Sequence, residues 1–164
     1  MINDLNRFSP DGHLLATGGQ DSLVKIWALK TAEIYFNDCS RLTSNLTKQQ
    51  TEILTNRFQE FHQETLSDTQ TSTTTINTKL GLHENQAPLY PKPFCELKGH
   101  QASVLDVAWS KSLFVLSSSM DKTVRLWHLS RSECLCFFRH IDFVSAIAFH
   151  PRDDRYFVSA SLDG

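Results

Sequence analysis

A histidine, a serine and an aspartate lie near one another in this sequence, at His100, Ser117 and Asp121. These residue types are the general base, the nucleophile and the orienting carboxylate of a serine hydrolase. No G-x-S-x-G motif, which exposes the nucleophile in one large class of such enzymes, accompanies them. A tryptophan, Trp127, follows the aspartate in the stretch MDKTVRLWH. Whether these residues perform chemistry depends on the elements that hold them.

The spacing of these residues recurs along the chain. Trp27 follows Asp21 by six residues, as Trp127 follows Asp121, and Asp163 lies 42 residues after Asp121 (163 − 121 = 42). A period of about 40–45 residues is typical of four-stranded propeller blades. Each aspartate follows an apolar, β-prone run, in LLATGGQD, FVLSSSMD and YFVSASLD. The spacing therefore indicates a structural repeat in which imidazole, hydroxyl and indole groups satisfy a carboxylate, and we assign no catalytic residue.

The segments KGHQASVLDVAWS and RLWHLS resemble the WD-repeat β-propeller family. Gly99-His100 stands at the family's Gly-His pair, and Trp127-His128 at its Trp-Asp pair. The resemblance implies an all-β propeller segment and a hydrogen-bonded structural tetrad of His100, Ser117, Asp121 and Trp127. It also implies partial tetrads in the neighbouring repeats, at Thr17, Asp21 and Trp27 and at His140, Ser159 and Asp163.

The repeats divide the chain into four segments. A partial repeat is expected over 1–30, an insertion over 31–92, a complete repeat over 93–138 and a truncated repeat over 139–164. The predicted fold is therefore one complete and two partial blades of four-stranded antiparallel sheet. Because propellers close with typically 4–8 blades, we expect the sequence to be a fragment of a longer protein.

The insertion is rich in Ser, Thr, Asn and Gln, which bury too little apolar surface to offset the entropy of ordering. Only residues 47–66 favour an amphipathic helix, with Ile53, Leu54, Phe58 and Phe61 near helical spacing. The rest of 31–92 is predicted to be disordered. Such a helix would either pack on the side of the propeller or dock into a groove of a partner.

Composition narrows the function. The chain has 164 residues, 40% of them hydrophobic, and a formal charge of −2 without a basic stripe, which disfavours nucleic acid as a partner. No apolar run is long enough to insert into a membrane. Cys134 and Cys136 have no second cysteine pair at metal-ligand spacing, so buried thiols are favoured over zinc. We expect no metal, no cofactor and no small-molecule substrate, and therefore no enzyme.

A narrower resemblance is carried by LSSSMDKTVRLWHLSRSECLCFFRHIDFV and AFHPRDDRYFVSASLDG, which are similar to WD-repeat proteins that act as rabphilin-type effectors of Rab GTPases. It implies a cytoplasmic scaffold, peripheral at endosomal or Golgi-derived membranes, whose Rab-binding segment lies before the propeller. No residue of this chain is assigned to Rab contact. The alternative is a substrate-receptor or assembly subunit of a larger complex such as a ubiquitin ligase.

The stretch HPRDDRYF lies outside the general blade pattern. Its charged residues Arg152, Asp153, Asp154 and Arg155 have two interpretations. Arg152 could cap the hairpin by pairing with Asp153 or Asp154, an ion pair that contributes little if exposed. Alternatively, the four residues form a recognition loop on one rim of the propeller.

Overall fold

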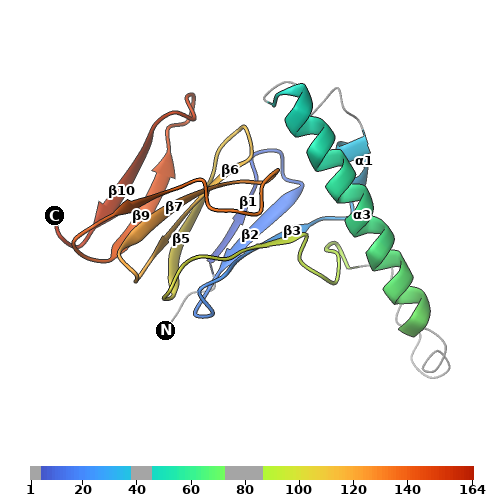
Figure 1. Cartoon of the computed structure of the whole chain (residues 1–164), viewed down its shortest axis with the longest axis horizontal. Coiled ribbons are helices and arrows are strands. Elements are labelled where there is room, and N and C mark those ends of the chain that lie inside the picture. Colours follow the sequence, from blue (N-terminus) through green and yellow to red (C-terminus); the bar gives the residue numbers. More distant parts are fainter. Residues whose placement is uncertain (1–4, 38–45, 73–86) are drawn as a thin grey trace.

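The computed structural model describes residues 5–37, 46–72 and 87–164. Its strands form antiparallel sheets that stand side by side as blades, with two helices at one end (Figure 1). The first blade contains β1 (Leu5–Phe8), β2 (Leu14–Gly18), β3 (Val24–Ala28) and β4 (Cys95–Leu97), and the second contains β5 (Val104–Trp109), β6 (Phe114–Ser119), β7 (Thr123–His128) and β8 (Cys136–Arg139). A third sheet pairs β9 (Val144–Phe149) with β10 (Phe157–Ser161). This arrangement confirms the predicted all-β propeller segment with an insertion.

The turn after the second strand is built alike in the first two blades. The carboxylates of Asp21 and Asp121 accept the N–H of the residue two positions on, at 3.2 Å from Leu23 N and 3.0 Å from Thr123 N. The residue between, Ser22 or Lys122, has a left-handed backbone with φ near 60°. Aspartate favours such turns because its short side chain bonds nearby backbone donors. The repeated aspartate therefore fixes the connection between two strands.

The strands are shared between blades differently from the sequence segments. β4 pairs with β3 in the register Val24↔Leu97 and Ile26↔Cys95, so it completes the first blade from beyond the insertion. The repeat over 93–138 thus contributes its first strand to one blade and its other four to the next. The expectation of a single complete blade is corrected to two four-stranded blades and one strand pair. The reason is that a sequence repeat and a folded blade are offset by one strand.

The insertion contains two helices in the described residues, α1 (Ala32–Asn37) and α3 (Lys48–Ser72). The helix expected over 47–66 lies within α3, which starts at a reciprocal cap: Thr47 Oγ1 accepts the N–H of Gln50, and Gln50 Oε1 accepts the N–H of Thr47. The expectation of disorder is wrong at α1 and at the C-terminal end of α3. It also extends over 38–45 and 73–86, which lie outside the described residues.

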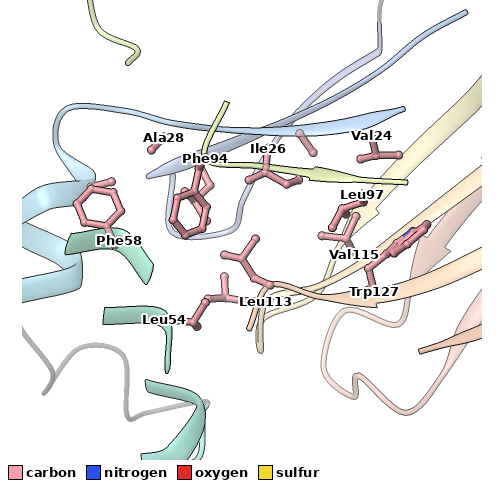
Figure 2. Close-up of a cluster of buried hydrophobic side chains, with 14 of the residues drawn as sticks. Val24, Ile26, Ala28, Leu54, Phe58, Phe94, Leu97, Leu113, Val115 and Trp127 are labelled. Atoms are coloured by element: carbon pink, nitrogen blue, oxygen red, sulfur yellow. The ribbon is translucent and has the colours of Figure 1, made fainter. Parts of the chain in front are cut away.

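The largest hydrophobic core joins the helices to both complete blades (Figure 2). Leu54 and Phe58 of α3 face Phe94 and Leu113, which precede β4 and β6 respectively. The Phe58 ring stacks on Phe36 of α1 with centroids 4.5 Å apart. The insertion is therefore packed as part of the blades, because burying aromatic side chains repays the cost of ordering them.

Polar contacts also fasten α3 to the second blade. Arg57 Nη1 donates to the carbonyl oxygen of Leu129 at 2.7 Å, just beyond the end of β7. Gln50 Nε2 lies 3.4 Å from His128 Nε2. The helix therefore bridges the two complete blades at one end. Within the described residues, neither helix combines the length and the apolarity needed to span a membrane.

Candidate functional site

The structure brings His100, Ser117, Asp121 and Trp127 together on the face of the second blade that meets the first. His100 lies between two partners, with Nδ1 at 2.8 Å from Asp121 Oδ2 and Nε2 at 2.7 Å from Ser117 Oγ. The indole N–H of Trp127 donates to Ser117 Oγ at 2.9 Å. Ser117 and Trp127 have no exposed surface. Each strand supplies its member because side chains two residues apart return to the same face.

Every polar atom of this tetrad has a structural partner. The Asp121 carboxylate also accepts hydrogen bonds from the Thr123 hydroxyl at 2.6 Å and from the backbone N–H of Gln101 at 3.0 Å. Burial alone would raise the pKa of Asp121, but the hydrogen bonds from Thr123, Gln101 and His100 outweigh it and hold that pKa below its ordinary value. Asp121 is therefore a stable carboxylate.

Burial lowers the pKa of His100 even though the Asp121 carboxylate acts in the opposite direction. The hydrogen-bond pattern assigns a neutral imidazole with its proton on Nδ1, which donates to Asp121, while Nε2 accepts from the Ser117 hydroxyl. The Ser117 hydroxyl is thus engaged with His100 and Trp127 and shielded from solvent. A serine nucleophile needs access to a substrate carbonyl, so this geometry serves to hold strands together.

The neutral His100 makes stability depend on pH. Because the folded pKa lies below the unfolded value of about 6.5, the stabilisation is complete above about pH 6.5 and is lost as the pH falls through the folded pKa. We expect the free energy of unfolding to fall between about pH 7.5 and about pH 5.5. Urea unfolding at the two pH values measures this loss.

The matched control for this pH effect is His100→Gln, which keeps hydrogen-bonding groups but does not titrate. Its free energy of unfolding should fall less than that of the wild-type protein over the same pH interval. An equal fall in both proteins would contradict the assignment of a buried neutral His100. Asp121 does not interfere, since its depressed pKa places its own contribution below this interval.

The partial tetrads are joined only in part. In the first blade the Trp27 indole N–H donates to Thr17 Oγ1 at 3.0 Å. Asp21 is instead bonded to Lys25 Nζ at 2.6 Å, and that lysine lowers the pKa of Asp21. This blade therefore has the hydroxyl–indole contact without the carboxylate as a member.

The third sheet shows the other half of the arrangement. Ser159 Oγ lies 3.3 Å from His140 Nε2. The Asp163 carboxylate accepts the backbone N–H groups of Ile141 at 2.9 Å and Asp142 at 3.3 Å, so it fixes the loop that follows the histidine. Histidine and serine meet here, and the aspartate holds the adjacent backbone.

The loop between β9 and β10 pairs its charges differently from the prediction. Arg155, and not Arg152, forms the ion pair with Asp153, with Arg155 Nη2 2.7 Å from Asp153 Oδ2. The Arg155 guanidinium lowers the pKa of Asp153 to about 2. Asp154 accepts the backbone N–H of Ser112 at 2.9 Å and so ties this loop to the β5–β6 turn. The geometry corrects the cap and leaves recognition by this loop as a prediction.

Two structural residues were not found from the sequence. Asp106 in β5 accepts the backbone N–H of Ile147 in β9 at 3.0 Å and lies 3.6 Å from Arg7 Nη2 in β1, so it connects all three sheets. Its signal was a lone charge inside the apolar run VLDVAW. His128 donates from Nε2 to Ser112 O at 3.0 Å and accepts the Ser130 N–H at 3.1 Å, and burial lowers its pKa.

The cysteines and acidic residues provide no metal centre in the described residues, where no group of three or more His, Cys, Asp or Glu side chains is placed to hold an ion. Cys134 is half-buried, whereas Cys136 is exposed, so the expectation of two buried thiols is wrong for Cys136. Burial raises the pKa of the Cys95 thiol to about 12, which keeps it protonated and unreactive.

Comparison with known proteins places these observations in context. The model of the WD domain, G-beta repeat, matches residues 1–28, 91–128 and 132–164. WD repeat-containing protein 44 of Xenopus laevis is 52% identical over 96% of this chain and 17% of its own length. An uncharacterised WD repeat-containing protein of Schizosaccharomyces pombe is 37% identical over 96% of this chain and 22% of its own length. The chain therefore spans about a fifth of the length of these relatives.

A solved structure supports the fold. The Cps50 (Swd1) β-propeller domain of Myceliophteria thermophila superposes with a TM-score of 0.58 over 98% of this chain and 33% of that one. The sequence identity between them is 18%, so the likeness concerns the fold alone.

Proposed function

The chain belongs to the WD-repeat family of β-propellers, and from that premise we propose that it acts without catalysis as a Rab-effector-like scaffold in endosomal recycling or vesicle trafficking. The coarser statement, a scaffold-type WD-repeat propeller, follows from the matched repeats and the propeller neighbour. The non-enzymatic part is supported by the tetrad, where the Ser117 hydroxyl is fully buried and engaged with His100 and Trp127.

The trafficking part rests on the narrower resemblance of LSSSMDKTVRLWHLSRSECLCFFRHIDFV and AFHPRDDRYFVSASLDG to rabphilin-type Rab effectors. The identity of 52% to WD repeat-containing protein 44 over nearly the whole chain is the observation that carries it. The proposed location is the cytoplasm, peripheral at endosomal or Golgi-derived membranes. The proposed partners are proteins, and a Rab would bind through a segment outside this chain.

A nucleotide-dependent binding assay tests the trafficking proposal. The full-length natural protein is immobilised and incubated with a panel of purified Rab GTPases, each loaded with a non-hydrolysable GTP analogue or with GDP. We expect at least one Rab to be retained in its GTP-analogue form and released in its GDP form. A Trp127→Ala variant distinguishes a separate Rab-binding segment, which should still bind, from binding by the blades.

Retention of no Rab, or equal retention of both nucleotide forms, would contradict the Rab-effector proposal. It would favour the second candidate, a component of a larger complex such as a ubiquitin ligase. One observation supports that candidate: a protein of Mus musculus whose name makes it a component of chromatin assembly factor 1 is 24% identical over 96% of this chain. Co-purification in one stable complex of defined stoichiometry would then be the expected result.

A further inference from the structure

The β7–β8 hairpin presents two arginines and a phenylalanine on one face. The register Arg125↔Phe137 and Thr123↔Arg139 places these side chains on the same side of the sheet, because residues directly opposite in a ladder share a face. Trp127, two residues from Arg125, packs with residues of the first blade, so this face looks toward that blade. The opposite face, with Val124 and Leu126, packs toward β9 and β10.

The two guanidinium groups lie over the same ring. Arg125 Cζ is 5.6 Å and Arg139 Cζ is 5.5 Å from the centroid of Phe137. A cation over an aromatic ring is attracted by the negative face of the ring. The pairing brings two like charges close together, which is unfavourable unless an anion is shared between them.

Neither guanidinium has a carboxylate partner in the described part of the chain, where the ion pairs involve other arginines and lysines. Arg125 Nε is buried without a hydrogen-bond acceptor among the same residues. The nearest strand of the first blade, β4, directs Glu96 to its other face, where it lies opposite Lys25. Two cations on one face thus remain without a counter-charge.

The exposure of this face does not arise from an incomplete blade. Phe137 is 49% exposed, although both blades that border it have all four strands. The other exposed aromatic of β8, Phe138, differs because it faces the two-stranded sheet and contacts Phe157 there. Gly99, between the two complete blades, has no side chain to fill the space beside Arg125: an added Cβ would come 2.7 Å from Arg125 Nη1.

β8 is the outer edge of its sheet, and all four of its residues are exposed. An edge strand offers unpaired backbone N–H and C=O groups to an extended peptide. Side chains of such a peptide would alternate between the two faces, and every second one would lie beside Phe137.

We propose that the outer edge of the second blade, with Arg125, Phe137 and Arg139, binds an extended acidic segment of a partner protein whose alternate residues are glutamate or aspartate. The backbone of the segment pairs with β8, and its carboxylates bind the two guanidinium groups. This site is independent of the proposed Rab-effector role, because it requires no Rab and concerns residues within the blades.

The test measures peptide binding to the full-length protein by fluorescence anisotropy. The probe is a blocked, fluorescein-labelled peptide of alternating threonine and glutamate, and the matched probe has glutamine in place of glutamate. We expect the glutamate probe to bind more tightly and to weaken as salt is raised from ~50 mM to ~300 mM, since salt screens exposed charges. Arg139→Glu should raise the Kd about tenfold or more, because it removes one guanidinium–carboxylate pair and adds a repulsion.

Arg131→Glu is the matched control, because Arg131 is an exposed arginine in the connection between the same two strands and does not contact Phe137. It should bind the glutamate probe as the wild type does, and Arg139→Lys should retain most of the affinity. Both residues are exposed, so equal melting temperatures will show that the variants are folded. The proposal is overturned if the wild type does not prefer the glutamate probe, if Arg139→Glu binds it unchanged, or if Arg131→Glu weakens it equally.

Discussion

We expect the Trp127→Ala variant to lose about 3–5 kcal/mol of unfolding free energy, the range for truncating a buried tryptophan to alanine. Trp127 has no exposed surface and donates its indole N–H to Ser117 Oγ. The substitution therefore opens a cavity between the first and second blades and removes one of the two partners of the Ser117 hydroxyl. Thermal or urea unfolding of the full-length protein measures the loss.

Two controls separate the contributions to this effect. Trp127→Phe keeps most of the buried ring and removes the indole donor, so it should cost less than the alanine substitution. Met120→Ala removes a side chain that is 41% exposed, at the turn of the same blade, and should change the free energy of unfolding by less than about 1 kcal/mol, as is usual on a surface. A Trp127→Ala protein as stable as wild type would show that the blades do not meet at this tryptophan.

The Phe58→Ala substitution in α3 should destabilise the protein by about 3–5 kcal/mol as well, because it removes a buried aromatic side chain. Phe58 stacks on Phe36 and lies 5.9 Å from the Phe94 ring, centroid to centroid. An insertion that is not packed against the blades would show no loss at all. Urea unfolding of the full-length protein, followed by tryptophan fluorescence, reports whether the blades themselves become less stable.

Ile53→Ala is the matched control for this second prediction. Ile53 belongs to the same helix and is 37% exposed, on the side away from the aromatic core. It should be markedly less destabilising than Phe58→Ala. If the two variants unfold alike at the wild-type midpoint, α3 contributes nothing to the stability of the blades.

The repeated elements of the fold could be predicted from the sequence because they depend on local spacing. The offset of six residues from Asp121 to Trp127 places a turn before a strand, and the structure brings both residues to the tetrad at that spacing. The hydroxyl and the imidazole come from other strands and loops, but the repeat period supplied their positions. The tetrad needed no information beyond this period.

The insertion required information that local spacing does not contain. The sequence around α1 is short and has one aromatic pair, Tyr35 and Phe36, so its composition indicated no packed helix. Its order comes from Phe58 and Phe94, which are distant in the sequence and meet Phe36 only in the folded chain. Composition measures what a segment can bury by itself, and here the buried surface is supplied by other segments.

The same limit explains the pairing of β4 and the charges of the β9–β10 loop. Nothing near Cys95 shows that its strand completes a sheet begun at Leu5. Of the two arginines that flank Asp153, only the backbone conformation selects Arg155 as its partner. Patterns of residue type identify an element, whereas the choice of partner depends on geometry.

The place of the insertion also sets an order of folding. β3 ends at Ala28 and β4 begins at Cys95, so joining these neighbours closes a loop of 66 residues (95 − 28 − 1 = 66), while the strands of the second blade follow one another through short connections. Closing a loop about ten times longer costs roughly 2 kcal/mol more in chain entropy, and contacts distant in sequence form slowly. The second blade can therefore assemble early from local contacts, and the first acquires its outer strand only after α1 and α3 have shortened the distance that the chain must search.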